Sequence, residues 1–146
     1  MRIVLDTNAL VRAHSRSSSQ ARSLLVELLA RRHRLILSNE ILAEVTRVLR
    51  YSKFQALFGL AEEDLLEYTQ FLQSVSHLVI LEPNYHAPLR DPNDLMVLQT
   101  AERGDADILC THDADFYEPM TFSYCASRGI EVCNEFALIE RLARDG

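Results

Sequence analysis

The sequence predicts an α/β protein, a Rossmann-like three-layer sandwich with a parallel sheet of about five strands. Short apolar runs rich in β-branched residues, typical of strands buried on both faces, alternate along the chain with longer segments of helical periodicity. That alternation implies parallel strands with helices on both faces of the sheet. The first run, residues 3–5, ends abruptly at Asp6-Thr7-Asn8. Polar residues at the carboxyl end of such a strand lie where open parallel sheets bind ligands.

The expected elements follow one another in the order that builds such a sheet. Strands are predicted at residues 3–5, 35–37, 78–81, 108–110 and 130–132. Helices are predicted at residues 19–33, 39–50, 62–74 and 92–103 and after Asn134, with a single helical turn at 9–13. Residues 51–60 are apolar but weakly periodic, and the segment between Phe116 and the last strand is predicted to be a loop.

Length and composition favour one globular domain over residues 1–146. The chain is 48% hydrophobic and 25% charged, as is usual for soluble proteins. No apolar run approaches the roughly 20 residues that span a bilayer, and no signal peptide is expected before a strand that starts at residue 3. The cysteines are three in number and lack a CxxC spacing, which favours reduced thiols in the cytoplasm over a disulfide or zinc framework.

Charge is unevenly distributed along the chain. Residues 1–60 hold ten Lys and Arg against four acids, a net +6, whereas residues 61–146 hold five against seventeen, a net −12. This asymmetry predicts a basic surface from the first half and an acidic pole or pocket supplied largely by the second. Nearly all the cations are arginines, which suit bidentate phosphate contacts, although solvated helix faces explain most of them equally well.

Three further acids are predicted to lie, like Asp6, next to the apolar core, where a charged side chain is unfavourable. Glu44 and Asp94 fall on the apolar faces of their predicted helices, and Asp113 follows the strand at 108–110. A carboxylate desolvated beside a core is costly unless it is compensated. Each also has a local explanation: Asp94 lies in a first helical turn, Glu44 is three residues from Arg47, and Asp113 can cap a short helix.

Taken together, the four acids predict a cation site. Like charges gathered in a partly dry pocket repel one another strongly. A hard divalent cation with oxygen ligands removes this repulsion, and Mg²⁺ or Mn²⁺ suits a set made entirely of carboxylates.

Four segments of the chain resemble, in order, the four motifs of the PIN domain family. They are residues 4–8, 41–45, 94–101 and 111–116, and the resemblance covers about residues 1–140. It implies a Mg²⁺- or Mn²⁺-dependent ribonuclease, and the Asp91-Pro-Asn-Asp94 opening is most similar to the VapC-like PIN group, toxin components of toxin–antitoxin pairs. Carried over by position, the catalytic and metal-binding residues are Asp6, Glu44, Asp94 and Asp113. The supporting residues are Asn8, Thr111 and Asp115.

Two of these assignments have neighbours that compete with them. Asp91 competes with Asp94, but its place as the N-cap of the helix at 92–103 accounts for it fully. Asp115 competes with Asp113, which is nearer the strand and therefore preferred as a ligand. His112 is expected to face solvent.

The RNA and any protein partner have candidate contacts outside the four motifs. Arg12, His14 and Arg16 follow the first strand and are candidates to grip the RNA backbone, with Arg47, Arg50 and Arg90 as weaker ones. The apolar side chains of Phe54, Leu57, Phe58 and Leu60 either pack internally or form a surface for a second copy or for an antitoxin segment.

Other functions remain open at this point. A PIN-like module that binds RNA or protein without cutting would share the same residues. A phosphatase of the haloacid dehalogenase type also opens with a strand-end aspartate but requires a second one where this chain has Asn8. A receiver-like signalling domain requires a lysine late in the chain, and the only lysine is Lys53.

Overall fold

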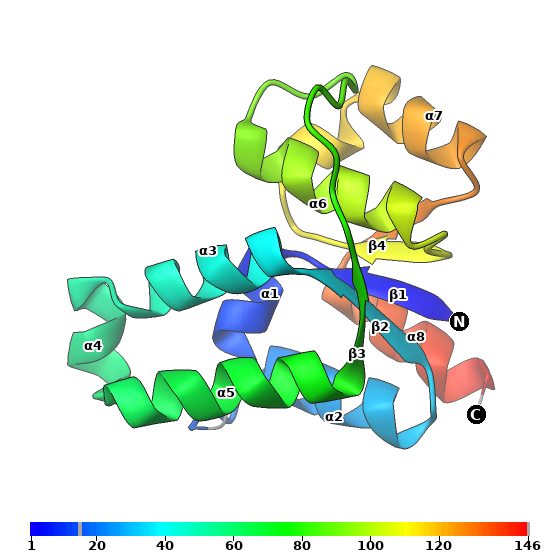
Figure 1. Ribbon diagram of the computed structural model, residues 1–146. Coiled ribbons are helices and arrows are strands. Elements are labelled where there is room, and N and C mark those ends of the chain that lie inside the picture. The colour runs from blue at the N-terminus through cyan, green and yellow to red at the C-terminus, as the bar shows by residue number, and fades with distance from the viewer. Residues whose placement is uncertain (15, 146) are drawn as a thin grey trace.

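A parallel sheet of five strands lies between two layers of helices (Figure 1). The computed structural model describes residues 1–14 and 16–145. The sheet has the order β3-β2-β1-β4-β5, which confirms the predicted Rossmann-like α/β sandwich. The strands are β1 (Arg2–Leu5), β2 (Arg34–Ser38), β3 (Ser76–Val79), β4 (Ile108–Cys110) and β5 (Glu131–Cys133).

The first strand is the centre of the sheet. β1 pairs in parallel with β2 on one side, where Ile3 is aligned with Leu35, and with β4 on the other, where Leu5 is aligned with Cys110. The side chains of β1 from Ile3 to Leu5 are completely buried, as the apolar run predicts. Because the chain leaves β1 toward β2 and later returns beside it as β4, the carboxyl ends of β1 and β4 flank the point where the strand order reverses. This is where open α/β sheets form a crevice.

The helices cover both faces and extend beyond one end. Figure 1 shows α6 and α7 on one side of the sheet and α2 and α8 on the other, while α3, α4 and α5 form an arm with α4 at its tip. Their bounds are α1 (Thr7–Arg12), α2 (Gln20–Ala30), α3 (Asn39–Leu49), α4 (Ser52–Phe58), α5 (Glu62–Val75), α6 (Pro92–Arg103), α7 (Pro119–Ser127) and α8 (Glu135–Asp145).

Polar side chains cap several helices, as predicted for Asp91. Asp91 accepts a hydrogen bond from the backbone N–H of Asn93 at the start of α6, and Asn134 accepts one from Ala137 at the start of α8. Asp6 caps α1 through the N–H of Ala9 at 2.8 Å. These bonds satisfy helix N–H groups that have no partner inside the helix.

Three sequence predictions of local structure are wrong. The expected loop after Phe116 contains α7, preceded by the short 3₁₀ helix η1 (Ala114–Tyr117). The third strand begins at Ser76 rather than 78, and Ile80, inside the predicted strand, lies beyond it with 81% of its surface exposed. The first long helix ends at Ala30 rather than 33, because the chain turns there and Arg32 adopts a positive φ of 63°.

One glycine sets how closely α6 approaches the sheet. A Cβ atom on Gly104, at the end of α6, would lie 2.3 Å from Cγ2 of Ile36 in β2. Glycine therefore does more here than end a helix: it brings α6 into direct contact with a central strand. Among the described residues, no helix is both long and apolar enough to cross a membrane.

Candidate metal centre

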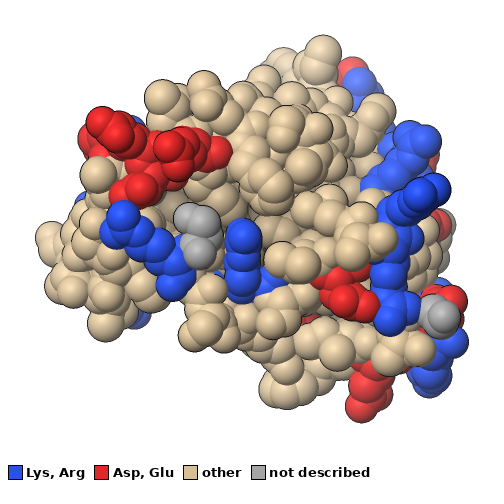
Figure 2. Space-filling model, turned by 90° about the horizontal axis from the view of Figure 1, so that it is seen from below, with Lys and Arg blue, Asp and Glu red and all other residues tan. Residues whose placement is uncertain are grey.

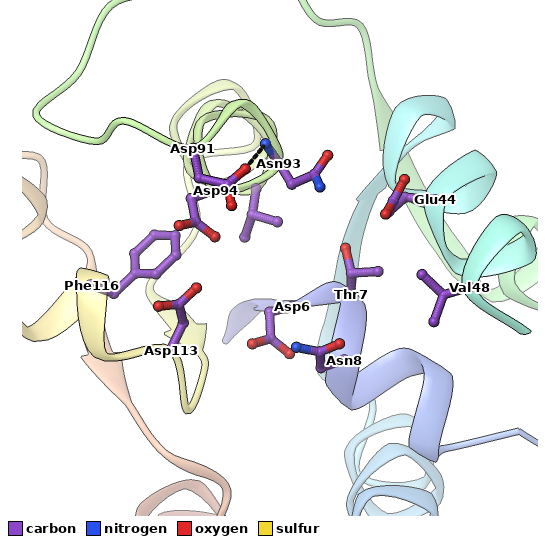
Figure 3. Close-up of a pocket in the computed structure, with 11 residues that line it drawn as sticks. Asp6, Thr7, Asn8, Glu44, Val48, Asp91, Asn93, Asp94, Asp113 and Phe116 are labelled. Carbon is purple, nitrogen blue, oxygen red and sulfur yellow. Dashed lines mark hydrogen bonds between the residues drawn. The ribbon is translucent and has the colours of Figure 1, made fainter. Parts of the chain in front are cut away.

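A pocket opens at the carboxyl ends of β1 and β4, where the sheet topology places a crevice (Figure 3). Its volume is about 160 Å³. The four acids singled out in the sequence, Asp6, Glu44, Asp94 and Asp113, all line it. They come from the end of β1, from α3, from α6 and from the turn after β4, so segments far apart in the chain converge on one space.

Asp6 is a buried carboxylate held at both oxygens. Oδ1 accepts the hydrogen bond from Ala9 that caps α1, and Oδ2 accepts one from the hydroxyl of Thr111 at 2.6 Å. The same hydroxyl accepts a hydrogen bond from the backbone N–H of Asp113 at 3.0 Å. Burial raises the pKa of Asp6, and the two hydrogen bonds oppose that rise. Thr111 thus fixes the positions of two acids at once.

Asp94 lies against two other carboxyl groups. Asp94, Asp113 and Asp115 each present a carboxylate oxygen within 4.8 Å of the other two. Asp94 is buried, and its Oδ2 has no hydrogen-bond partner among the described residues. Burial and the neighbouring carboxyl groups, Asp113 first among them, raise the pKa of Asp94 to about 8. A bound cation would reduce both the cost of burying this carboxylate and its repulsion from the neighbouring carboxylates.

The two competing acids have distinguishable surroundings. Asp91 lines the pocket, but its carboxylate already caps α6. Asp115 is exposed, and its backbone N–H donates to Oδ1 of Asp113 at 2.9 Å. The structure therefore brings Asp115 to the acidic cluster beside Asp113 instead of separating the two.

Glu44 faces the pocket from the opposite wall (Figure 3). Its side chain is 15% exposed, and both its oxygens contact the guanidinium of Arg47, at 2.5 and 2.9 Å. The local pairing anticipated from the sequence is thus present, and it coexists with a position on the pocket wall. Neither Glu44 nor Asp6 belongs to the group of oxygens within 4.8 Å of one another. Asn8 also lines the pocket and is exposed.

The three proposed RNA-gripping residues differ in their accessibility. Arg12 is 40% exposed and pairs with Glu135 at 2.6 Å. His14 is only 1% exposed, and its ring packs edge-on against Phe58. It offers no surface to RNA, so the prediction that His14 contacts the RNA backbone is wrong. Arg16 donates to the carbonyl oxygens of Phe58 and Gly59 and pairs with Asp64 at 3.2 Å, so it ties the first loop to the arm.

The basic surface expected from the first half is interrupted by acids. Figure 2 shows acidic side chains next to basic ones on the face seen from below, and uncharged surface separates these charged clusters from one another. Arg31, Arg47 and Arg50 pair with Glu27, Glu44 and Glu62. Since each of these arginines is partly neutralised, the net charge of a chain segment overstates the positive potential of its surface. His112 is exposed, as expected.

The apolar segment of the arm is mostly internal. Leu60 is buried, and Phe54 and Phe58 pack against the core. Leu57 is the exception, with 67% of its surface exposed. Internal packing therefore explains Leu60 fully and the half-buried Phe54 and Phe58 in part.

Sequence reasoning missed Glu135. This first residue of α8 is 1% exposed, and its carboxylate pairs with Arg12 and lies 3.7 Å from Nε2 of His112. An acid in a first helical turn is ordinary, so its sequence carries no signal of burial.

The chain resembles known proteins in both sequence and fold. The family model described as "PIN domain" matches residues 2–115, so this chain belongs to the PIN domain family, whose members are generally nucleases. Among solved structures, one similar chain is from the crystal structure of VapBC2 from Rickettsia felis bound to a DNA fragment from their promoter. The two chains share 17% sequence identity over 92% of this chain and 98% of that one, with a TM-score of 0.57. No curated protein matches the sequence.

Proposed function

We propose that this protein is an endoribonuclease that depends on Mg²⁺ or Mn²⁺ and hydrolyses RNA phosphodiester bonds. The observation that carries the proposal is the convergence of Asp6, Glu44, Asp94 and Asp113 on one pocket at the topological switch point of the sheet. Four acids from four separate elements have no shared structural task there. A phosphodiester is itself an anion, so an acidic pocket that cleaves it requires a cation between the two.

The residues of the pocket fit a hard divalent cation. The donor set consists of carboxylate oxygens, which Mg²⁺ and Mn²⁺ prefer. Oδ2 of Asp94 is buried without a hydrogen-bond partner among the described residues and lies beside Asp113 and Asp115. Asp6, Glu44, Asp94 and Asp113 would hold the ion, with Asp115 beside them. When bound, a divalent cation supplies activation of water and offsets the charge that develops on the phosphate.

The chain's own residues orient the site. Thr111 and the start of α1 hold the Asp6 carboxylate toward the pocket, and the turn that follows Thr111 presents Asp113. In the described part of the chain, the pocket is lined by acids, Thr7, the amides Asn8 and Asn93 and apolar side chains. If a water activated by the divalent cation is the nucleophile, neither a histidine base nor attack by the 2′-hydroxyl is needed, and we expect products with a 5′-phosphate.

Cleavage of a panel of structured RNAs tests the assignment. The wild-type chain should cut in Mg²⁺ or Mn²⁺ and stop in EDTA, and Asp94→Asn should abolish cleavage. Glu140→Gln, which removes the charge of an exposed acid on α8, is the matched control and should cleave normally. Full activity in EDTA, or in the Asp94→Asn variant, would refute the metal site.

The proposal extends to a biological role as the toxin of a type II toxin–antitoxin pair in the cytoplasm. It is supported by the family membership and by a fold shared with a chain of a VapBC2 structure. The implied partners are RNA, a cognate antitoxin protein and a second copy of the chain. A small upstream gene that encodes a DNA-binding segment and suppresses toxicity on co-expression would support the role, and the solution mass of the isolated chain tests the homodimer.

One observation favours the alternative of a PIN-like module that binds RNA or protein without catalysis. Glu44 is already paired with Arg47, and this pair reduces the charge that it can offer to a cation. RNA binding without cleavage under any divalent metal would establish this alternative.

A further inference from the structure

A second groove adjoins the acidic pocket. It shares Asp6, Asn8 and Asp113 with that pocket, and its volume is about 470 Å³. We call this space the Phe54 groove. The rest of its wall is formed by Val11, Arg12, Lys53, Phe54 and His112. These side chains come from α1, from α4 and from the turn after β4. Because the two spaces share three residues, a ligand bound in one can continue into the other.

The two spaces differ in charge. Acids line the first pocket, and none of the described residues on its wall is Lys, Arg or His, whereas Arg12, Lys53 and His112 line the Phe54 groove. Lys53 is exposed, and it is the only lysine of the chain. An anionic strand whose reacting phosphate lay in the acidic pocket would find its next charge facing cations.

Arg12 is held in place by an ion pair with Glu135. The buried carboxylate of Glu135 contacts one terminal nitrogen of its guanidinium at 2.6 Å, while 40% of the Arg12 side chain stays exposed. A guanidinium has five N–H donors, so a pair with one carboxylate oxygen leaves donors free for a ligand. The same carboxylate lies 3.7 Å from Nε2 of His112. Glu135 therefore acts as a positioning residue for the cationic wall.

The Phe54 ring packs against a second aromatic side chain. Its ring stacks on Phe58 with centroids 6.4 Å apart and planes at 12°, and Phe58 in turn packs edge-on against the buried His14 at 4.3 Å. The ammonium of Lys53 lies 5.5 Å from the centroid of Phe54. An aromatic ring beside flexible cations is the combination that single-stranded nucleic acids use, with bases on the ring and phosphates on the cations.

We propose that the Phe54 groove binds the nucleotide next to the scissile phosphate of a single-stranded RNA. The base packs against Phe54, and the adjoining phosphate contacts Arg12 and Lys53. The inference rests on the proposed function, because it takes the reacting phosphate to lie in the acidic pocket. It adds a subsite for one unpaired base, because only a base free of a duplex can leave its stack and reach the Phe54 ring.

Fluorescence anisotropy measures the interaction with the full chain in Ca²⁺, a hard cation that also binds carboxylate oxygens. A gel of the recovered oligonucleotide shows that it stays uncut during the measurement. The probe is a short single-stranded oligoribonucleotide of mixed sequence, and the comparison is the same oligonucleotide paired with its complement. The variants are Phe54→Leu, which removes the ring, and Lys53→Gln, which removes the charge. Arg144→Gln, which removes an exposed cation on α8 outside the groove, is the control.

The expected results differ for each variant. Phe54→Leu weakens binding of the single strand by about tenfold and leaves its salt dependence unchanged. Lys53→Gln reduces the slope of log affinity against log salt by about 0.7, as expected for one lost phosphate contact. The duplex binds more weakly than the single strand and is insensitive to Phe54→Leu, and Arg144→Gln behaves as wild type.

The inference is overturned by no binding of the wild type, by equal binding of single strand and duplex, by no effect of Phe54→Leu, or by an equal loss in Arg144→Gln. Sensitivity to Lys53→Gln alone means that the groove attracts any polyanion, including an acidic peptide, and also overturns it. Cleavage in Mn²⁺ separates this result from the proposed function. Wild-type cleavage with no effect of Phe54→Leu rejects the subsite alone, whereas base-dependent binding without cleavage rejects the nuclease and retains the subsite.

Discussion

The hydroxyl of Thr111 donates a 2.6 Å hydrogen bond to Oδ2 of Asp6, although the two residues lie 105 positions apart in the chain. The bond joins the ends of β1 and β4, the strands that flank the topological switch point. Since the hydroxyl oxygen of Thr111 also accepts a hydrogen bond from the backbone N–H of Asp113, this one side chain orients two of the four acids. Ligand orientation by such neighbours commonly changes metal affinity by about 10- to 100-fold.

Replacing this hydroxyl should weaken metal binding without unfolding the protein. We expect Thr111→Val, which keeps the shape and removes the donor, to raise the Mn²⁺ concentration needed for half-maximal cleavage by about 10- to 100-fold. Thr111→Ser should restore most of the affinity. A titration of cleavage rate against Mn²⁺ measures both, and a Thr111→Val variant with the wild-type metal requirement would show that the Asp6 orientation does not depend on the bond.

Asp94 should make the metal-free protein less stable at neutral pH. Its pKa is raised in the folded state, from 3.8 to about 8, so it favours the folded state fully only below about pH 4, and this contribution is lost as the pH rises toward 8. Asp94→Asn should therefore raise the free energy of unfolding in EDTA at pH 8 by about 1 kcal/mol or more, the equivalent of one pKa unit.

Thermal unfolding of both proteins from pH 4 to pH 8 checks this sign. The stability difference between Asp94→Asn and wild type should grow with pH in EDTA, and Mn²⁺ should raise the melting temperature of the wild type more than that of the variant. A difference that shrinks as the pH rises would show that Asp94 is stabilised as a carboxylate by the protein alone.

Arg16 should contribute to stability and not to RNA binding. Its guanidinium donates to two carbonyl oxygens at the end of α4 and pairs with Asp64. We expect Arg16→Gln to lower the free energy of unfolding by about 1 kcal/mol, the typical value of hydrogen bonds lost at a partly exposed site. Urea unfolding measures the loss. The salt dependence of RNA binding should match wild type, and a reduced slope would return Arg16 to the RNA surface.

The central part of the fold could be predicted from the sequence because its signals are local. The run at residues 3–5 and the Asp91-Pro92 start of α6 each specify an element through their own side chains. β3 is an edge strand whose Leu78 is 40% exposed, so hydrophobicity does not mark its bounds. Helix α7 begins with Pro119 but lacks the capping side-chain hydrogen bond that marks α6, so its start has a weaker local signal than the start of α6.

The candidate site shows the same division. Acids on apolar helix faces could be found because they conflict with local rules, and the structure gathers them in one pocket. The burial of His14 and of Glu135 could not be predicted, since each depends on a partner distant in sequence, Phe58 for the ring and Arg12 for the carboxylate. Residue type indicates what a side chain can do, and tertiary contacts decide whether a ligand can reach it.

Gly104 supplies the last prediction, because it connects the packing of α6 to the acidic pocket. α6 carries Asp94 in its first turn and ends at Gly104, where a Cβ would lie 2.3 Å from Cγ2 of Ile36. Ile36 is completely buried in β2, so the added methyl must displace the Ile36 side chain within a packed core, or move the helix or the strand. We expect Gly104→Ala to lower the free energy of unfolding by about 1–3 kcal/mol. It should also reduce cleavage, since any tilt of α6 moves Asp94.

A double variant separates this clash from an effect on the turn itself. Gly104 has a φ of −91°, which alanine adopts without strain, so the cost should come from Ile36 alone. Ile36→Leu removes the branched Cγ2 methyl at nearly constant volume, and in its background Gly104→Ala should cost less than it does in the wild type. Urea unfolding of the four proteins gives the interaction energy. Additive costs would place the strain elsewhere than at the contact between α6 and β2.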